Sequence, residues 1–227
     1  MAEDFRCIAI ETATEQCSVA VANNDACTVI RLSSARESSR EIYAAINRAL
    51  SDAGLQLADV TCIAFGCGPG SFTGLRVAAG AAQALAYSRS LPVCRISTLG
   101  ALALNGARKH GVVHVAACLD ARMGEAYLGL YECESPELAR PLLPDCLVAP
   151  GEIELEPPVG GLLAAGSGWS AWPESIERNS HSLAAVDPSI WPDAGAVASL
   201  ARHEFAAGNA VAAHAAIPNY IREQVTT

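Results

Sequence analysis

Short apolar runs separated by polar turns open the chain and predict β-strands. Three runs cover about Phe5–Glu11, Cys17–Ala22 and Cys27–Leu32, and polar turns separate them at Thr12–Glu15 and Asn23–Asp25. Strands joined by such tight turns form an antiparallel meander. We therefore expect the chain to begin with three antiparallel strands.

A similar series of apolar runs begins near residue 112. Strands are predicted over about Val112–Leu119, Glu125–Cys133 and Leu142–Val148, with a polar turn at Asp120–Gly124. Residue identity between the two series is weak, so the order of elements alone suggests an internal duplication.

Apolar positions at helical spacing follow the first meander. Ser38-Ser39-Arg40-Glu41 has the pattern of a capping box and starts a predicted helix that ends at Gly54. The further predicted elements are a strand at Val60–Gly66, a helix at about Gly74–Ser90, a strand at Val93–Ile96, a helix from Ser97 or Thr98 to about Lys109, a strand at Leu162–Ala165 and a helix from Asp193 to Gly208. Two lobes that each continue a meander with strand–helix units predict an α/β fold, with a mixed sheet covered by helices in each lobe.

The composition is that of a globular protein with an aliphatic core. Of the 227 residues, 51% are hydrophobic and 17% are charged. The net charge is −9 and Lys109 is the only lysine, which disfavours RNA binding by this chain alone because phosphate neutralisation supplies most of the affinity for RNA. The first residues lack a signal-peptide pattern, and no apolar run approaches the ~18 residues of a membrane span. We therefore expect a cytoplasmic protein without membrane contact.

Cysteine and histidine patterns give no support for a metal site. The nine cysteines are odd in number and form no C-x-x-C pair, which favours free thiols in a reducing compartment. His110 and His114 have the spacing of a metal-binding pair, but Gly111 breaks the helix that would align their rings. The histidines also have no Gly-x-Ser-x-Gly partner, so a Ser/His/Asp triad is not predicted.

The most informative stretch is a glycine-rich turn between a strand and a helix. It consists of Gly68, Pro69, Gly70, Ser71, Phe72, Thr73, Gly74, Leu75 and Arg76. Glycines at a helix N-terminus leave backbone N–H groups open to an anion, and the hydroxyls and the arginine add polar groups. The spacing matches neither a P-loop nor a dinucleotide-binding fingerprint. A contact with an anion and a purely structural turn are both compatible with this pattern.

Two hairpin tips and one helix complete the candidate features. Glu11 and Thr12 follow the first strand, and Asp120 and Arg122 follow the first strand of the second series. Tips of this kind suit the phosphates and metal of a nucleotide if they face one another across a cleft, and are ordinary hairpin turns otherwise. The helix after the glycine-rich turn is rich in Ala and contains Gly80, which costs about 1 kcal/mol relative to alanine. Such a helix suits close contact with another helix, in this chain or in a partner.

Taken in order, these motifs resemble the TsaB family, the small subunits of the bacterial machinery that makes threonylcarbamoyl-adenosine in tRNA. The resemblance covers nearly the whole chain and rests above all on the nine-residue glycine-rich turn. The other matching segments are Ile8-Ala9-Ile10-Glu11-Thr12-Ala13-Thr14, Ser97-Thr98-Leu99, Ala101-Leu102-Ala103, Asp120-Ala121-Arg122-Met123-Gly124-Glu125 and Pro218-Asn219-Tyr220-Ile221-Arg222.

The resemblance implies a two-lobed fold of the actin, hsp70 and sugar-kinase type. The first lobe is expected over residues 1–103 and the second over 104–192, with a terminal helix and tail over 193–227 returning towards the first lobe. In this family the subunit is not the catalyst. It forms a heterodimer with the catalytic protein TsaD through helices of the first lobe, and a homodimer when alone. The implied partner-interface candidates are Ile42, Ile46, Arg48, Leu75, Ala79, Gly80, Gln83 and Tyr87.

The resemblance also bears on the other components of the assembly. The ATPase TsaE is expected to join the larger complex, and tRNA is expected to be bound only through that complex. No intrinsic cofactor or metal is expected, although a nucleotide could bind at the interface with TsaD.

Three departures from the family pattern favour a non-catalytic role. Glu11 stands where Asp is usual, Ser38-Ser39-Arg40-Glu41 replaces a His-Ser-Glu-like helix start, and Gly166-Ser167-Gly168 replaces Gly-Asp-Gly. The alternative is an ATPase or phosphotransferase of the sugar-kinase-like class, in which Glu11 or Asp120 would act on metal-bound phosphate. A peptidase is less favoured, because the sequence offers no nucleophile paired with a base and no metal pair.

Overall fold

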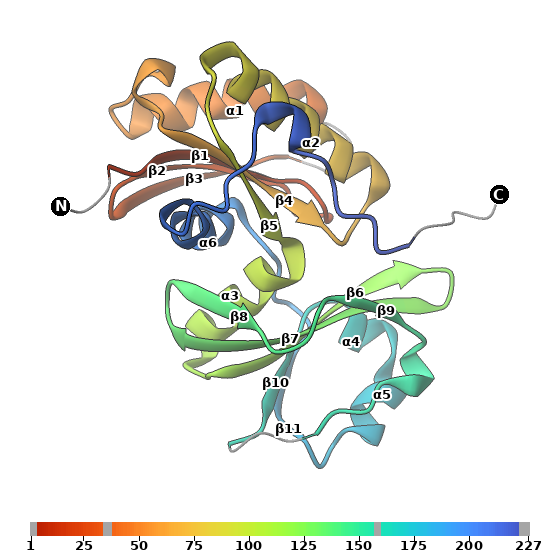
Figure 1. The fold of residues 1–227 in the computed structure, drawn as a ribbon. Coiled ribbons are helices and arrows are strands. Elements are labelled where there is room, and N and C mark those ends of the chain that lie inside the picture. Colours follow the sequence, from red (N-terminus) through yellow and green to blue (C-terminus); the bar gives the residue numbers. More distant parts are fainter. Residues whose placement is uncertain (1–3, 34–37, 157–159, 223–227) are drawn as a thin grey trace. The chain divides into compact units, whose positions relative to one another are not determined.

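The computed structural model describes residues 4–33, 38–156 and 160–222 (Figure 1). They form two compact units. The first combines the residues up to Ala101 with Pro192–Asn219, and the second combines Leu102–Trp191 with the residues from Tyr220. Each unit contains a mixed sheet with helices, which confirms the predicted α/β fold with two such sheets. The lobe boundaries predicted at 103/104 and 192/193 stay a prediction.

The sheet of the first unit has the strand order β3-β2-β1-β4-β5. Its strands are β1 (Arg6–Glu11), β2 (Ser18–Asn23), β3 (Ala26–Arg31), β4 (Cys62–Gly68) and β5 (Val93–Ser97). The first three strands pair antiparallel, as the polar turns predicted, whereas β4 runs parallel to β1 and β5 runs parallel to β4. Parallel strands need crossover connections, which helices supply here.

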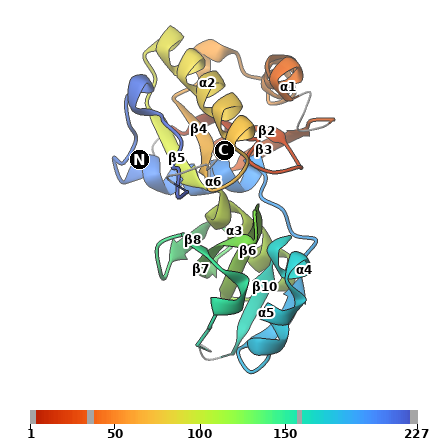
Figure 2. The ribbon, with the colours of Figure 1, turned by 90° about the vertical axis from the view of Figure 1, so that its right-hand side faces the viewer.

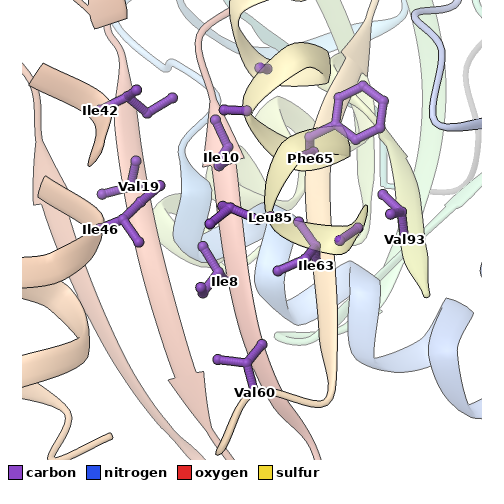
Figure 3. Packing of buried hydrophobic residues seen from close by; sticks show 14 of the residues in the cluster. Ile8, Ile10, Val19, Ile42, Ile46, Val60, Ile63, Phe65, Leu85 and Val93 are labelled. Carbon is purple, nitrogen blue, oxygen red and sulfur yellow. The ribbon is translucent and has the colours of Figure 1, made fainter. Parts of the chain in front are cut away.

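Helices cover both faces of this sheet (Figures 1 and 2). The helices α1 (Ser38–Asp52) and α2 (Phe72–Arg89) lie on one face, and α6 (Ala194–Ala206) packs on the other. Short 3-10 turns at Leu57–Asp59 and Ala213–Ala215 complete the unit. The core between the sheet and the first two helices is aliphatic (Figure 3), and includes Ile8, Ile10, Val19, Ile42, Ile46, Ile63, Phe65 and Leu85.

The helix starts show how local chemistry sets the ends of these elements. The helix α2 begins at Phe72, two residues before the predicted start, because the Ser71 hydroxyl accepts a hydrogen bond from the Gly74 N–H (3.4 Å). Near the start of α1, the Glu41 carboxylate accepts hydrogen bonds from the backbone N–H (3.0 Å) and hydroxyl (2.8 Å) of Ser33. The side chains of the predicted capping serines, Ser38 and Ser39, lie outside the described residues.

The sheet of the second unit has the order β11-β10-β6-β7-β8, and β9 also pairs with β7. Its strands are β6 (His114–Arg122), β7 (Glu125–Ser135), β8 (Leu138–Pro141), β9 (Cys146–Val148), β10 (Leu162–Ala165) and β11 (Leu183–Asp187). The strand predicted over Leu142–Val148 is confirmed only at its end, where Cys146–Val148 form β9, and is wrong over residues 142–145. The long strand β7 pairs with two short strands instead, and Pro141 and Pro144, which lack a backbone donor, accompany the break between them. The strand β11 was not predicted.

The helices of the second unit are short, apart from α3. The helix α3 (Thr98–His110) begins in the first unit and ends in the second. The other helical segments are η2 (Pro150–Glu152), α4 (Gly168–Ala171) and α5 (Pro173–Arg178). The core of this unit centres on Trp169, which is fully buried and donates its indole N–H to the Ala116 carbonyl (3.0 Å).

Candidate functional site

The glycine-rich turn packs against the first hairpin turn of the same chain. The Thr12 hydroxyl donates to the Gly74 carbonyl (2.7 Å), and the Ser71 N–H donates to the Ala13 carbonyl (2.7 Å). A Cβ atom added at Gly74 would lie 1.9 Å from the Thr12 carbonyl oxygen, and one added at Gly70 would lie 2.5 Å from that of Ala13. These two glycines are therefore required by the close approach of the chain's own backbone, which favours the structural interpretation of the turn.

The start of the glycine-rich turn packs against the C-terminal segment at Asn219. Gly68 has φ +114°, and an added Cβ there would lie 2.9 Å from the Asn219 carbonyl oxygen. The Asn219 N–H donates in turn to a β4 carbonyl (2.7 Å). At the other end of the turn, Thr73 and Arg76 are exposed. The predicted contact with an anion at Ser71, Thr73 or Arg76 stays a prediction.

Glu11, at the end of β1, is fully buried. Its Oε1 accepts a hydrogen bond from the Ala13 N–H (2.7 Å) and its Oε2 accepts one from the Thr98 hydroxyl (3.3 Å). A Cβ added at Gly66 would lie 1.9 Å from Oε2, so the carboxyl fills the space that this glycine leaves. The pKa of Glu11 is raised from 4.5 to about 7, mainly by burial; the Asp193 carboxylate contributes to the rise, and hydrogen bonds from Ala13, Thr98 and Thr12 oppose it. The side chain therefore faces the core and not an open hairpin tip.

The second predicted tip, at the β6–β7 turn, is held by polar side chains and not by backbone contacts. The Asp120 carboxylate accepts hydrogen bonds from the Arg122 backbone N–H (2.8 Å) and guanidinium (3.0 Å). The guanidinium of Arg222, in the C-terminal tail, donates to the carbonyls of Ala121 (3.2 Å) and Arg122 (3.3 Å) and forms an ion pair with Glu125. The turn thus presents carbonyl oxygens to a cation of its own chain. The two tips belong to different units, and the prediction that they face one another stays a prediction.

Half of the predicted partner-interface residues are buried within the chain. Ile42 and Ile46 of α1 and Leu75 and Ala79 of α2 are buried in the core of the first unit. They lie on the faces of the two helices that pack on the sheet. These four residues therefore shape the core beneath the helices, and their predicted role at a partner interface stays a prediction.

The other four interface candidates reach the surface to different extents. Arg48 is exposed and lies 3.7 Å from the Asp52 carboxylate one turn along α1. Gly80 and Tyr87 are exposed on α2, whereas the half-buried Gln83 donates its amide to the Ala216 carbonyl (3.1 Å). Their predicted role at an interface stays a prediction.

The exposed side of α2 forms a continuous stripe, which we call the α2 face. It consists of Phe72, Arg76, Gly80, Ala84 and Tyr87, which follow one another at helical spacing. Phe72 is 48% exposed and Tyr87 is 83% exposed, and the Arg76 guanidinium lies 3.4 Å from the centre of the Phe72 ring. Ala84 was not predicted as an interface residue, although its spacing from Gly80 and Tyr87 would have indicated it.

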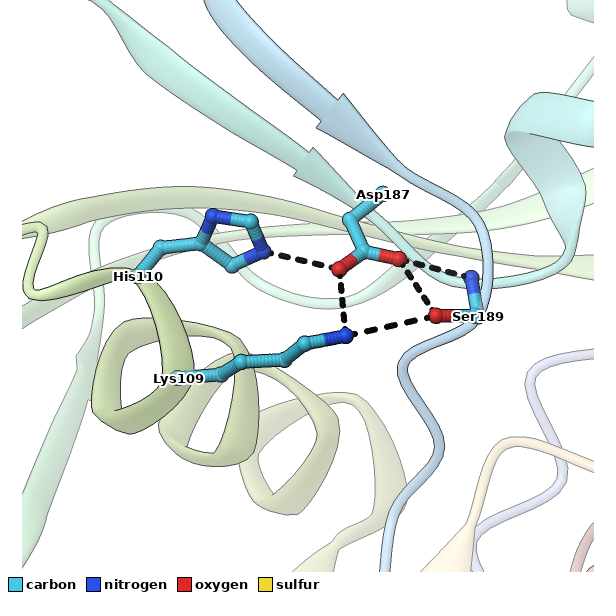
Figure 4. A network of polar contacts seen from close by, with 4 residues as sticks. All are labelled: Lys109, His110, Asp187 and Ser189. Atoms are coloured by element: carbon cyan, nitrogen blue, oxygen red, sulfur yellow. Dashed lines mark hydrogen bonds and ion pairs between the residues drawn. The ribbon is translucent and has the colours of Figure 1, made fainter.

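A polar cluster in the second unit combines residues that the sequence separates widely (Figure 4). Asp187, at the end of β11, accepts hydrogen bonds from Lys109 (2.8 Å) and the Ser189 hydroxyl (2.6 Å), and its Oδ2 lies 2.8 Å from His110 Nε2. These contacts, led by that of Lys109, hold the pKa of Asp187 well below its usual range. The arrangement differs from a catalytic triad, because the serine hydroxyl is bonded to the carboxylate and not to the imidazole. No local sequence signal links positions almost 80 residues apart.

The described part of the chain contains no group of three or more His, Cys, Asp or Glu side chains placed to hold a metal ion, and the expected lack of a metal site stays a prediction. No helix in the same residues is long and apolar enough to cross a membrane. All nine cysteines are free thiols, with Cys27 and Cys146 exposed and the others buried.

Known proteins match this chain over nearly its whole length. A family model described as "TsaD: tRNA N6-adenosine threonylcarbamoyltransferase" matches residues 29–181. The "tRNA threonylcarbamoyladenosine biosynthesis protein TsaB" of Escherichia coli is 34% identical over 223 residues, which cover 97% of this chain and 96% of the relative. The protein of the same name from Haemophilus influenzae is 32% identical over 231 residues, covering 99% and 96%.

A solved structure shows the same fold. "YeaZ from Pseudomonas aeruginosa" has a TM-score of 0.88 and 33% sequence identity, and the match covers 95% of this chain and 99% of that protein. The chain therefore belongs to the family that the TsaD model describes and, within it, to the TsaB proteins.

Proposed function

We propose that this chain is a non-catalytic subunit that supports the formation of threonylcarbamoyladenosine in tRNA by docking, through its α2 face, on a catalytic protein of the TsaD type. The pathway is supported by relatives named for tRNA threonylcarbamoyladenosine biosynthesis, which align with nearly the whole chain. The match to a model described as a transferase supports kinship with the catalytic protein.

The observation that carries the proposal is the exposed glycine in the middle of α2. A Cβ added at Gly80 would have no atom within 4 Å, so packing within the chain does not require a glycine there. A glycine at such a position costs about 1 kcal/mol relative to alanine. A glycine at this position would allow the backbone of a partner to approach α2 closely. The exposed residues Phe72 and Tyr87 supply aromatic side chains of the kind that dominate binding energy at interfaces.

The geometry of the two tips supports a non-catalytic role. The carboxylate of Glu11 is enclosed in the core, and that of Asp120 is bonded to Arg122. Backbone of the first hairpin turn fills the space that Gly70 and Gly74 leave. An ATPase or phosphotransferase would instead have to turn these groups towards a metal-bound phosphate.

The net charge of the chain disfavours direct contact with tRNA. A chain with a net charge of −9 gains little from contact with RNA phosphates, so tRNA is contacted by other subunits. The ATPase TsaE joins the larger complex in the cytoplasm, and any nucleotide binds at the interface with TsaD. In the absence of TsaD, the same α2 face pairs two copies of the chain.

The test combines two variants of the α2 face with a control on another surface. Gly80→Ala should stabilise the free chain by about 0.5–1 kcal/mol, since alanine is the better helix former, yet weaken docking about tenfold because one methyl group enters a close contact. Tyr87→Ala should weaken docking by about tenfold or more. The control is Leu143→Ala, whose side chain is 59% exposed in the second unit and which should dock like the wild type.

Docking is measured by titration calorimetry against the TsaD protein of the same organism, and function by reconstituted tRNA modification. The proposal is contradicted if the two α2 variants dock as tightly as the wild type. It is equally contradicted if modification proceeds at the same rate without this chain.

A further inference from the structure

Glu11 is a buried carboxyl at the end of β1, and no basic side chain acts on it in the part of the chain that the structure describes. The groups that act on Glu11 are the backbone N–H groups of Thr12 and Ala13, the Thr98 hydroxyl, and the Asp193 carboxylate. Burial of a carboxylate without a cation is unfavourable, so a fold that keeps such a group is expected to use its position or its protonation.

The hydrogen bonds of this carboxyl lead directly to the first turn of α2. Its Oε1 accepts from the Ala13 N–H (2.7 Å), and the carbonyl of the same Ala13 accepts from the N–H of Ser71, the N-cap of α2 (2.7 Å). The neighbouring Thr12 hydroxyl donates to the Gly74 carbonyl within that turn (2.7 Å). A shift of the carboxyl therefore moves Thr12 and Ala13, and through them the start of the helix.

The site leaves the carboxyl little freedom to move without this consequence. On the side of β4 it meets Gly66, whose added Cβ would lie 1.9 Å from Oε2, and on the side of α3 it meets the Thr98 hydroxyl. The charged group that acts on it from α6 is Asp193, whose carboxylate caps that helix by accepting from the Ala196 N–H (2.8 Å). Of these contacts, the one with the Ala13 N–H in the hairpin turn is the one that continues to α2.

We propose that Glu11 is a positioning residue that holds the first turn of α2, and with it the α2 face, in the geometry needed to dock on the partner. The proposal rests on the proposed function, because the partner is the TsaD-type protein named there. It goes further by assigning control of docking to a residue that the partner does not touch.

Protonation makes this positioning sensitive to pH. A neutral carboxyl suits the buried site, whereas an ionised one favours opening of the hairpin turn towards water. Docking should therefore weaken as pH rises through the pKa of Glu11, about 7. If docking raises the pKa of Glu11 by one unit, the affinity for TsaD should fall by close to tenfold between low and high pH.

The experiment compares the wild type with Glu11→Gln and Glu11→Asp. Gln keeps the shape and one acceptor oxygen but does not titrate, so its affinity for TsaD should stay constant between about pH 6 and about pH 8, while that of the wild type falls. The shorter Asp cannot reach the Ala13 N–H and fill the space beside Gly66 together, so it should dock more weakly than Gln at every pH. Titration of groups on TsaD affects all three proteins alike and cancels in the comparison.

Amide hydrogen exchange of the free chain separates this proposal from the proposed function. The protection factors of the Ser71 and Gly74 amides should fall with rising pH in the wild type and stay level in Glu11→Gln. If the wild type fails to dock at any pH while these protection factors titrate as expected, the proposed function is wrong and the positioning role stands. If docking occurs but its pH dependence is the same in the wild type and in Glu11→Gln, the positioning role is overturned.

Discussion

The two hairpin turns that follow β1 and β6 look alike in sequence and differ in physical state. Each places an acidic residue at the end of the first strand of a meander. In the first turn the carboxyl of Glu11 is enclosed by the chain, and burial raises its pKa to about 7. In the second, the carboxylate of Asp120 is part of a polar turn that the cation of Arg222 closes from outside.

The difference shows that surroundings, more than residue type, decide what an acidic turn can do. The first turn is held by backbone contacts with the glycine-rich turn, and it contributes shape to the start of α2. The second turn is held by charge-assisted hydrogen bonds from a side chain about 100 residues away in sequence. Disruption of the first turn should therefore affect packing and pH dependence, whereas disruption of the second should act locally.

The largest effect is expected from Gly74→Ala, at the contact between the first turn and α2. The added methyl group would lie 1.9 Å from the Thr12 carbonyl oxygen, and the other atoms that it would meet are also backbone of the hairpin turn, which leaves no easy relaxation. The free energy of unfolding, measured by urea denaturation, should fall by about 3 kcal/mol or more. If Gly74→Ala instead unfolded at the wild-type midpoint, the contact between the two turns would not be as close as described. Gly80→Ala on the same helix, which should be slightly stabilising, is the matched control.

The second prediction concerns the pH dependence that burial gives to the first turn. Between pH 4.5 and about 7 the folded chain holds a proton on Glu11 that the unfolded chain has released. Stability should therefore decrease as pH rises across this window and level off above it. Glu11→Gln removes this decrease and should exceed the wild type by roughly 3 kcal/mol above pH 7, since each unit of pKa shift corresponds to about 1.4 kcal/mol.

Urea denaturation at a series of pH values tests this expectation. Asp120→Asn is the matched control at the second turn, where it removes a carboxylate outside the core, and it should keep the wild-type decrease between pH 4.5 and about 7. Parallel stability curves for the wild type and Glu11→Gln would show that Glu11 ionises in the folded state as it does in water.

Much of the fold could be predicted from the sequence, because alternating apolar runs and helix caps are local signals. The meander of β1 to β3 and the strand–turn–helix unit around Gly74 follow from such signals. The state of Glu11 could not be predicted in this way. Its burial depends on Gly66 and Thr98, which approach it only when β4 and α3 pack around β1. The same limit applies to the burial of Ile42 and Leu75, since helical spacing does not show which side of a helix faces the sheet.

The smallest effect is expected from Arg222→Ala, at the second turn. The guanidinium is only 16% exposed and bonds two carbonyls and Glu125, so its loss should lower the free energy of unfolding by about 2 kcal/mol. Amide exchange should accelerate around Met123 and Gly124 and remain unchanged at Ser71 and Gly74. Arg140→Ala, at an exposed site on β8, should change stability by less than about 0.5 kcal/mol. If amide exchange around Met123 and Gly124 were unchanged in Arg222→Ala, the second turn would be held by its own Asp120–Arg122 contacts. The two turns would then differ only in the burial of their acidic residues.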